Sequence, residues 1–537
     1  MPLLKVNWQG KQRTLSFQSD PSLREILDTT DSRVRSGCRG NGRCGLCLVQ
    51  VETGTVNEPT ENERLGLTQE QLDQGIRFAC QVVPLHDLRI SIVNPAPTSN
   101  WKSIATHEYF SPLASPTIIN TQRQGNRLSK GVAIDLGTTH ISITLWDMYG
   151  GKRLAGRSGL NPQLLFGADV MTRVVATTES VERAREISQL AVDAVGEALF
   201  DICSREGLNP LEITHVSIVG NTAELALLSE KNYDMLLQPK FWTSQIVCQP
   251  GNTRPWSVAW HVNPDAVVDI VAPLAGFIGS DLLAGVLATA MTAQPKVTLL
   301  IDFGTNSEIA LWDGSVLWVT SAAGGPAFEG SGLSCGMPAV PGAIYQIEQN
   351  ELSQDFTFQV LAGADPKGLC GSGLVDLIAC LLRAGALDRK GKLTGEMAGE
   401  GFPLLKGSRR GIVLTNKDVD IFQRAKAAIG AGTRLLLKSA GMTTKKLERV
   451  YVSGAFGRFL NVRNAQNIGL LPGVAPHSIE LCGNTALAGC EMLLASPDRL
   501  IELESIRKRA RVINMSNHSE FEELFLENLY VKPMETD

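Results

Sequence analysis

The sequence lacks the features that membrane, exported and nucleic-acid-binding proteins need. None of its 537 residues lies in a run of 18 to 20 uninterrupted apolar residues, and Ser280 and Asp281 interrupt the most apolar stretch, 271–293. We expect that stretch to be a buried helix. The N-terminus alternates apolar and polar residues without the apolar core of a signal peptide, so export is not expected. The 50 Lys and Arg are dispersed and the formal charge is −5, which predicts no binding of nucleic acid or membrane.

Disulfide bonds are not expected either. The chain has 11 cysteines, an odd number, and only four of them show metal-ligand spacing. This usage indicates a reducing, cytoplasmic location. The other seven lie mainly among apolar residues and are expected to fill the core. They are Cys203, Cys248, Cys335, Cys370, Cys380, Cys482 and Cys490.

Length and internal repetition predict several domains. At about 100–200 residues per domain, a chain of this size is expected to contain three or four units. An apolar strand, an Asp-x-Gly-Thr turn and a return strand ending in Trp-Asp occur at 131–147 and again at 298–313. A repeat this long indicates duplicated domains. The predicted division is a small α+β domain at 1–93, a Pro- and Ser-rich linker at 94–130, a first lobe at 131–296 and a second lobe at 297–537.

The strongest chemical signal is the spacing Cys38-x5-Cys44-x2-Cys47-x32-Cys80. A 2Fe-2S cluster takes four thiolates, and ferredoxins place three on one loop and the fourth far downstream. The first gap is one residue wider than in plant ferredoxins and resembles the adrenodoxin-like pattern. Loop glycines permit positive φ angles and let backbone N–H groups approach the cluster sulfurs. These glycines are Gly37, Gly40, Gly42 and Gly45.

Zinc is the alternative metal for four cysteines. Structural zinc sites more often show two CxxC pairs or histidine ligands. This sequence has one CxxC and no nearby histidine before His86. We therefore predict a 2Fe-2S cluster on the four cysteines.

The two Asp-x-Gly-Thr turns indicate a phosphate site. Glycine lets the backbone close around a phosphate, Thr and Asn add donors, and consecutive N–H groups form an anion nest. The aspartate at the strand end is suited to hold Mg²⁺ or to orient the attacking water, so Asp135 and Asp302 are the predicted catalytic residues. One such turn alone is more often an ordinary hairpin, but an opposed pair is suited to grip the phosphates of ATP. The predicted residues are Asp135, Gly137, Thr138 and Thr139 in the first turn and Asp302, Gly304, Thr305 and Asn306 in the second.

Glycine-rich turns later in the chain predict the adenosine site. The segments 452–457 and 481–486 follow strands and offer small residues against which a nucleoside can lie. The segment 324–330 is either a further ribose or phosphate contact or a tight connection. Phe456 either stacks on the base or fills the core, and the core is favoured. The predicted contacts are Gly454, Ala455 and Gly457, with Gly324 and Gly325 from the third segment.

The paired turns and the late glycine-rich turn resemble the superfamily of acetate and sugar kinases, Hsp70 and actin. With the cysteine loop and the linker, essentially the whole chain resembles the reductive activators of corrinoid proteins. The resemblance implies a β-grasp ferredoxin followed by duplicated α/β lobes with a ribonuclease-H-like fold. It also implies ATP-dependent electron transfer from a 2Fe-2S cluster to the Co(II) corrinoid protein of a methyltransferase system, restoring Co(I). The resemblance further implies a homodimer, a Mg²⁺ ion and an upstream electron donor.

Carried over by motif, the resemblance places the cluster on Cys38, Cys44, Cys47 and Cys80, and the phosphate and Mg²⁺ roles on the two turns. Asn306 stands where the first turn has Thr139, so the sequence leaves open which turn binds the γ-phosphate. No catalytic base is identified. A related branch carries C-terminal 4Fe-4S clusters, and the absence of cysteine from 500–537 excludes that version.

Three other functions share these motifs. A metabolite kinase with a redox-sensing ferredoxin would use the same turns, but it needs a substrate pocket with a base. A nucleotide-dependent switch that only binds partners needs no hydrolysis. An activator of a thioester reductase or dehydratase usually shares a 4Fe-4S cluster at a dimer interface, which disagrees with the cysteine spacing.

Overall fold

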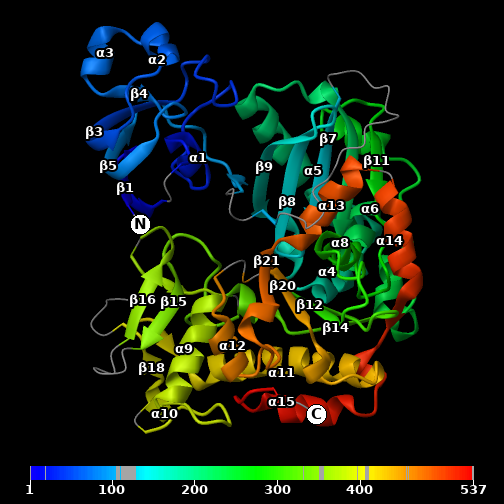
Figure 1. Cartoon of the computed structure of the whole chain (residues 1–537). Helices are drawn as coiled ribbons and strands as arrows, with labels where there is room; N and C mark the ends of the chain where they lie inside the picture. Colours follow the sequence, from blue (N-terminus) through cyan, green and yellow to red (C-terminus); the bar gives the residue numbers. More distant parts are fainter. Residues whose placement is uncertain are drawn as a thin grey trace.

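A computed structural model gives the fold of the chain (Figure 1). It describes residues 2–17, 20–104, 109–110, 129–330, 332–349, 356–363, 365–395, 397–405, 411–454, 456, 459–496 and 498–534. Within these residues an N-terminal five-stranded sheet precedes two six-stranded sheets. A smaller sheet of β15 (Ala343–Gln349), β16 (Phe356–Val360) and β17 (Gly368–Leu369) belongs to the second lobe.

The N-terminal unit has the strand order β2-β1-β5-β3-β4, in which β1 and β5 are parallel. Its strands are β1 (Leu3–Trp8), β2 (Lys11–Ser16), β3 (Leu48–Val56), β4 (Ile76–Phe78) and β5 (Pro84–Ile92), and its helices are α1 (Leu23–Asp28), α2 (Glu61–Gly66) and α3 (Gln69–Asp73). Ser22 caps α1 and Thr68 caps α3, each in a reciprocal box with the residue three positions on. The sequence pattern predicts helices from Ser22 to about Asp28 and near 68–75, and α1 and α3 confirm both, whereas α2 was not predicted.

The two large sheets repeat one topology, which confirms the predicted duplicated α/β fold. In each sheet, three consecutive strands form an antiparallel meander. The first strand of the meander also pairs in parallel with a strand from later in the chain, and this later strand pairs in parallel with one further strand. The first sheet contains β7 (Lys130–Leu136), β8 (His140–Asp147), β9 (Lys152–Leu160), β10 (Ile213–Gly220) and β11 (Val267–Ile270), with β6 (Lys102–Ser103) at its edge. The second contains β12 (Thr298–Phe303), β13 (Ser307–Trp312), β14 (Leu317–Ala322), β20 (Arg449–Gly454) and β21 (Ile479–Gly483), with β22 (Ala510–Val512) at its edge.

Two helices, α8 (Ser280–Thr289) and α13 (Thr485–Ala495), pack against each other and touch both sheets. Their apolar side chains join residues of both lobes in one buried cluster. The helix expected over 271–293 is thus shorter than predicted and begins at Ser280, where the polar residues interrupt the apolar run. In the described part of the chain, no helix is long and apolar enough to cross a membrane.

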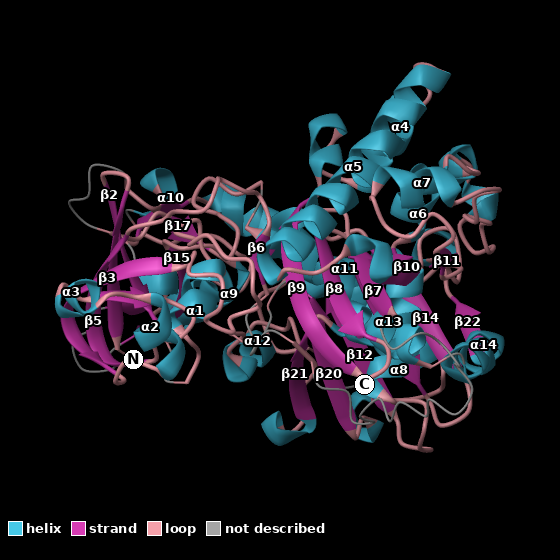
Figure 2. Ribbon diagram, turned by 90° about the horizontal axis from the view of Figure 1, so that it is seen from above, coloured by secondary structure: helices cyan, strands magenta, loops and turns pink. Residues whose placement is uncertain are grey.

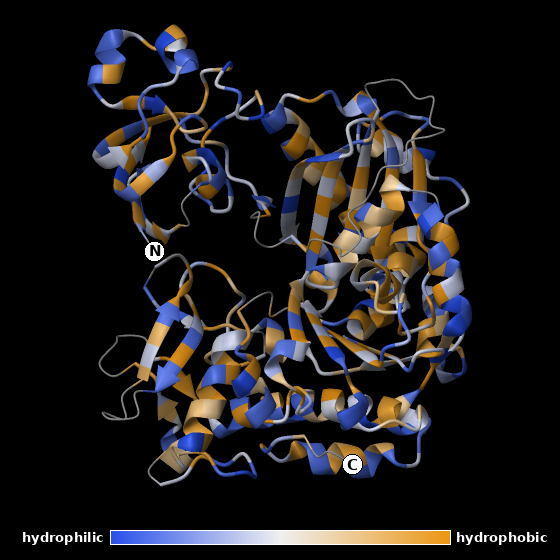
Figure 3. Ribbon diagram, in the orientation of Figure 1, coloured by the Kyte–Doolittle hydropathy of each residue, from blue (hydrophilic) through white to orange (hydrophobic). Residues whose placement is uncertain are grey.

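Long amphipathic helices cover the outer faces of the sheets. The helix α5 (Val181–Glu206) packs on β8 and β9 (Figure 2). The helix α11 (Asn416–Ser439) packs on β13 and β14, and α15 (Phe521–Leu529) packs against α11 and lies below it in Figure 1. The sequence pattern predicts helices over 185–206 and 418–441, and Ser180 and Thr415 cap the observed helices a few residues before these starts. Hydrophobic residues run through the central strands and helices (Figure 3).

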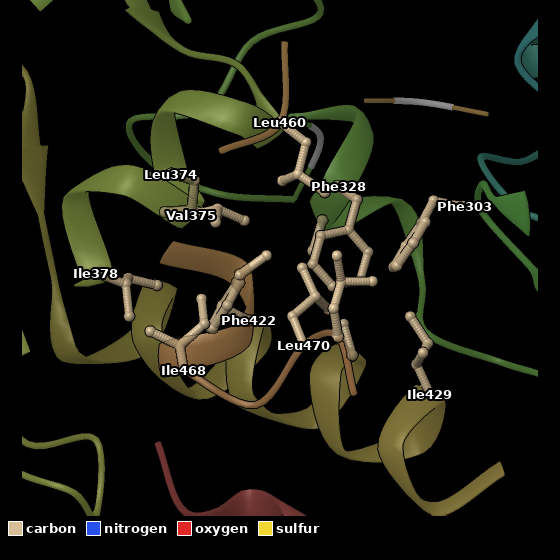
Figure 4. Packing of buried hydrophobic residues seen from close by; sticks show 14 of the residues in the cluster. Phe303, Phe328, Leu374, Val375, Ile378, Phe422, Ile429, Leu460, Ile468 and Leu470 are labelled. Atoms are coloured by element: carbon tan, nitrogen blue, oxygen red, sulfur yellow. The ribbon is translucent and has the colours of Figure 1, made fainter. Parts of the chain in front are cut away.

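An aromatic cluster supports the second phosphate turn from below. Phe303, in the turn itself, meets Phe328 with ring centroids 5.6 Å apart and Phe456 at 4.8 Å. Phe328 also packs edge-on against Phe422 of α11 at 5.9 Å (Figure 4). Phe456 is 3% exposed, so it fills the core, as predicted. Close packing of these rings therefore holds the second turn in a fixed position.

Candidate functional site

The three cysteines of the loop and the later Cys80 form two pairs. The Sγ atoms of Cys47 and Cys80 lie 3.4 Å apart, and the thiols of Cys38 and Cys44 share a hydrogen bond. All four are free cysteines. Two pairs suit a cluster of two irons that takes four thiolates, and iron binds the thiolate form. The residues present therefore fit a 2Fe-2S cluster.

Hydrogen-bond donors around Cys80 favour its thiolate form, which is the form that binds iron. The hydrogen bond from the Cys47 thiol, aided by donors from Gln81 and the Gly42 backbone, lowers the pKa of Cys80 to about 6. The same bond raises the pKa of Cys47. Gly42 has a φ of +72°, and a Cβ there would lie 2.9 Å from Cβ of Asn62. Only glycine brings its N–H this close to the sulfur without strain.

No group of three or more His, Cys, Asp and Glu side chains able to hold one metal ion occurs among the residues that the structure describes. The other seven cysteines are buried and free, as predicted from their apolar neighbours.

A buried network of ion pairs joins the cysteine-loop unit to the end of α5. Asp201 accepts two hydrogen bonds of 2.8 Å from Arg33 and one of 2.6 Å from Arg157 of β9. Glu206 accepts from Arg24 of α1 at 2.6 Å and from Arg157 at 3.3 Å. Figure 1 shows the N-terminal unit, in blue, beside the first lobe on the side of β9. It fixes the cysteine loop on the first lobe.

The contact between the end of α5 and the N-terminal unit extends to the segment just before the cysteine loop. Arg205 donates to the carbonyl oxygen of Val34 at 2.8 Å and pairs with Asp28, and Ser36 donates to the carbonyl oxygen of Arg205 at 2.8 Å. The loop carbonyl of Gly37 lies so close to Gly207 that a Cβ there would clash at 2.3 Å. The first cysteine ligand therefore follows directly after a fixed segment.

On its other side, the network lies four residues along the chain from Asn161, which is hydrogen-bonded to the first phosphate turn. Arg157 is on β9, and Asn161 follows the end of that strand. Asn161 donates through its side chain to the carbonyl oxygen of Gly137 at 3.0 Å and through its backbone to that of Thr139 at 2.9 Å. A short, buried path thus links the first phosphate turn to the unit with the cysteines.

The two phosphate turns face each other and touch. The hydroxyl oxygens of Thr139 and Thr305 lie 3.1 Å apart. Each hydroxyl also donates to the same oxygen of Glu329, at 2.7 Å in both cases. The turns that the sequence placed in separate lobes are therefore brought together at one point.

Four carboxyl groups gather beside the turns. Burial raises the pKa of Asp135 and of Asp302 to about 7, and the nearby charge of Asp281 adds to the shift. Burial also raises the pKa of Asp281 to about 6 and that of Glu308 well above its ordinary value. Glu308 accepts from the backbone N–H of Gly279 at 3.1 Å. A hard divalent cation prefers such oxygen donors and would relieve their mutual repulsion, so the chemistry of these groups suits Mg²⁺. In the described residues they do not converge on one ion position, so water would complete its coordination.

The remaining predicted residues of the turns lie around this centre. Asn221, the cap of α6 (Thr222–Ser229), donates to the hydroxyl of Thr138 at 2.9 Å. A Cβ on Gly137 would meet the carbonyl oxygen of His140 at 2.6 Å, so the turn needs glycine. Gly304 and Asn306 are half-buried in the second turn.

The late glycine-rich turns border the carboxyl groups. A Cβ on Gly454 would lie 2.4 Å from Oδ1 of Asp302, and Asn484 donates to Asp135 at 2.7 Å. Gly324 packs on α11, and Gly325 has a φ of +70° with open space at its Cβ position. The predicted contacts Ala455 and Gly457 lie outside the described residues.

Sequence reasoning missed three acidic residues of this centre: Asp281, Glu308 and Glu329. Each left a signal. Asp281 interrupts the apolar run 271–293, and Glu308, which pairs with Asp302, places a carboxyl where the first repeat has Ser142 opposite Asp135. Glu329 is the only charged residue of the glycine-rich segment 324–330.

A ferredoxin-type thiol loop joined to two opposed phosphate turns defines a class of protein: an iron–sulfur domain fused to an ATPase of the ASKHA superfamily. The sequence matches agree. Residues 6–85 match the 2Fe-2S iron-sulfur cluster binding domain, residues 130–294 the RACo middle region, and residues 296–537 the C-terminal domain of RACo, the ASKHA domain. The chain belongs to the family of reductive activators of corrinoid proteins. It carries a 2Fe-2S cluster domain and an ATP-binding domain.

Relatives cover most of the chain. The corrinoid activation enzyme RamQ of Eubacterium limosum is 31% identical over 422 residues, covering 74% of this chain and 70% of RamQ. The Co(II) methylated amine-specific corrinoid protein reductase of Methanosarcina barkeri is 28% identical over 412 residues, covering 71% of this chain and 72% of the reductase. A solved structure of a reductive activator for corrinoid, iron-sulfur protein is similar over 99% of both chains, with 26% identity and a TM-score of 0.68.

Proposed function

We propose that the chain is an ATP-dependent activator that transfers an electron from its 2Fe-2S cluster to the Co(II) corrinoid of a methyltransferase system and restores Co(I). One observation carries the proposal: a single chain joins four paired thiols to two opposed phosphate turns through a buried network of ion pairs. The activities named for RamQ and for the reductase of Methanosarcina barkeri support the same function.

The thiolates of Cys38, Cys44, Cys47 and Cys80 hold the cluster, which supplies a one-electron carrier. Backbone N–H groups of the loop, including that of Gly42, stabilise negative charge at these sulfurs. Leu46, Arg39 and Arg43 leave this edge of the loop exposed to a partner. The N-terminal unit therefore presents its carrier at the surface while its other side is fixed to the first lobe.

ATP provides the free energy that an uphill transfer needs. A one-electron step costs about a tenfold equilibrium factor for every 59 mV, so a gap of about 240 mV corresponds to about 10⁴. A factor of 10⁴ is about 5.5 kcal/mol, enough to change a two-state population from 1:99 to 99:1. Binding and hydrolysis of ATP between the two turns, in place of their contact through Glu329, is the event that supplies it. The path through Asn161 and Arg157 transmits this change to the docked ferredoxin unit.

In this proposal the phosphates lie between the turns of Gly137–Thr139 and Gly304–Asn306, and Mg²⁺ lies at Asp135 and Asp302 with Asp281 and Glu308. Adenosine lies against the turn at Gly454 with Gly324 and Gly325 nearby. The working division of the chain is ferredoxin domain 1–93, linker 94–130 and lobes 131–296 and 297–537. The protein acts in the cytoplasm as a homodimer that receives electrons from a separate donor.

The test uses the full chain with its cluster reconstituted, a reductant, a corrinoid protein and ATP. The Co(I) yield, followed by its optical spectrum, is expected to require ATP. An equal yield without ATP would reject the coupling. Free phosphate is the expected product, whereas a phosphorylated metabolite would indicate a kinase. A Cys44→Ser variant serves as the control, since it should lose Co(I) formation and keep nucleotide binding.

A further inference from the structure

Glu329 occupies the position between the phosphate turns that an anion would take. Its carboxylate oxygen accepts 2.7 Å hydrogen bonds from Thr139 of one lobe and Thr305 of the other. The two hydroxyls are also 3.1 Å from each other, so no phosphate fits between them in this arrangement. A terminal phosphate that binds both turns must therefore replace the carboxylate as acceptor.

The backbone around Glu329 holds it at this point. Glu329 ends the short helical turn η6 (Pro326–Glu329). Its neighbour Phe328 is 1% exposed and is clamped among Phe303, Phe422 and Phe456 (Figure 4). On the other side, Gly330 has a φ of +77°, and a Cβ there would lie 1.9 Å from the carbonyl oxygen of Met337. When phosphate displaces the Glu329 carboxylate from the two hydroxyls, the fixed backbone therefore keeps that carboxylate within one side-chain length of the phosphate.

The four other carboxyl groups serve a different purpose. Asp135, Asp281, Asp302 and Glu308 interact with one another, and their carboxylates are oxygen donors of the kind that a divalent cation prefers. Metal-bound carboxylates are poor proton acceptors, because the cation holds their lone pairs. Glu329 has hydroxyl partners in both turns and is available for the nucleophile.

We propose that Glu329 is a catalytic residue for the ATP hydrolysis of the proposed function, and that it accepts the proton of the attacking water. The water oxygen forms a bond to the γ-phosphorus, and the bond from that phosphorus to the bridging oxygen of ADP breaks. The electron pair of the broken bond leaves with ADP. The proton of the water passes to the Glu329 carboxylate and then to phosphate or solvent. In the nucleotide-free protein the same carboxylate holds the turns together.

Glu329→Gln keeps the size of the side chain and removes the proton acceptor. We expect kcat for ATP hydrolysis to fall about 10²- to 10⁴-fold, the usual contribution of a general base. The Kd for a non-hydrolysable ATP analogue should stay within about threefold or tighten, because the competing carboxylate charge is gone. Glu329→Asp retains an acceptor and should lose less activity than Glu329→Gln. Thermal unfolding and the optical spectrum of the cluster report whether each variant is folded.

Glu348→Gln is the matched control, because it makes the same change in β15 of the same lobe, where Glu348 accepts from Gln346 at 2.9 Å. It should hydrolyse ATP like the parent chain. A kcat of Glu329→Gln within threefold of the parent would overturn the role, as would a loss of nucleotide affinity as large as the loss of kcat. If Glu329→Gln does not fold, Glu329→Asp decides: reduced kcat with unchanged Kd supports the role, and unchanged kcat overturns it. A parent chain without hydrolysis would instead refute the proposed function.

Discussion

Replacing Asp201 by asparagine should loosen the ferredoxin unit from the first lobe. Asp201 is the shared acceptor of Arg33 and Arg157, whose side chains are 3% and 2% exposed. Removing one partner of a buried ion pair costs about 3–5 kcal/mol, because the remaining charge stays buried without compensation. Asparagine still accepts one hydrogen bond, so we expect about 3 kcal/mol.

Since about 1.4 kcal/mol changes an equilibrium tenfold, this cost lowers the ratio of docked to undocked units by at most about 10²-fold. Part of it falls on the first lobe itself, because Arg157 and Asp201 both belong to that lobe. Arg33→Met removes only the ferredoxin partner, and a double-mutant cycle with Asp201→Asn isolates the term that joins the units. We expect a coupling of about 1 kcal/mol or more.

Amide hydrogen exchange measures the result. Exchange should rise in α1 and near Arg205, where the two units are hydrogen-bonded, with the cluster spectrum unchanged. Asp265→Asn is the matched control, since Asp265 pairs with Arg254 at 2.8 Å on the same lobe but is exposed, and such pairs contribute at most about 1 kcal/mol. Exchange in Asp201→Asn no faster than in this control, or additive effects of the two substitutions, would refute the reasoning.

The other predictions concern the metals. Cys44→Ser should reduce the iron content below two per chain and remove the visible absorption of the cluster, whereas Cys248→Ser, at a buried thiol, should change neither. Because burial raises the pKa of Asp135 and of Asp302 to about 7, Mg²⁺ must displace protons from these carboxyl groups below that pH. The affinity for Mg²⁺, measured by calorimetry, should therefore rise by up to about tenfold per pH unit for each proton displaced, and level off above about pH 7. A constant affinity from pH 6 to 8 would contradict this. The raised pKa values also mean that the metal-free protein loses stability as pH rises from about 4 through 7, and Asp302→Asn should weaken that loss in thermal unfolding scans.

Short-range patterns made much of the fold predictable. The caps at Ser22 and Thr415 each accept a hydrogen bond from a backbone N–H three residues on, so the helix starts are encoded locally. The cysteine pairs lie on one loop and one later strand end, and their spacing was sufficient to predict the cluster. The repeat at 131–147 and 298–313 predicted two matching lobes because each copy carries its own strand, turn and strand.

The acidic centre and the ion-pair network depend on residues far apart in the chain. Glu329 meets Thr139 across 190 positions, and Arg33 meets Asp201 across 168. A charged residue has the same appearance in a sequence whether it is paired or solvated, so periodicity gives no signal for such contacts. The interrupted apolar run at Asp281 was the exception, since a charge within a buried helix needs a reason.

The position of α13 has a consequence for attempts to divide the protein. This helix comes from the last fifth of the chain, yet it packs on β7 and β10 of the first lobe. Its Glu491 accepts hydrogen bonds from Trp146 at 3.2 Å and from Arg153 at 2.7 Å, and Cys490 donates to the carbonyl oxygen of Ser217 at 3.2 Å. A fragment that stops near residue 296 would leave this apolar face of its sheet bare and prone to aggregate. A split version should remain folded when the two halves are co-expressed, because the later half then supplies α13 to the first lobe.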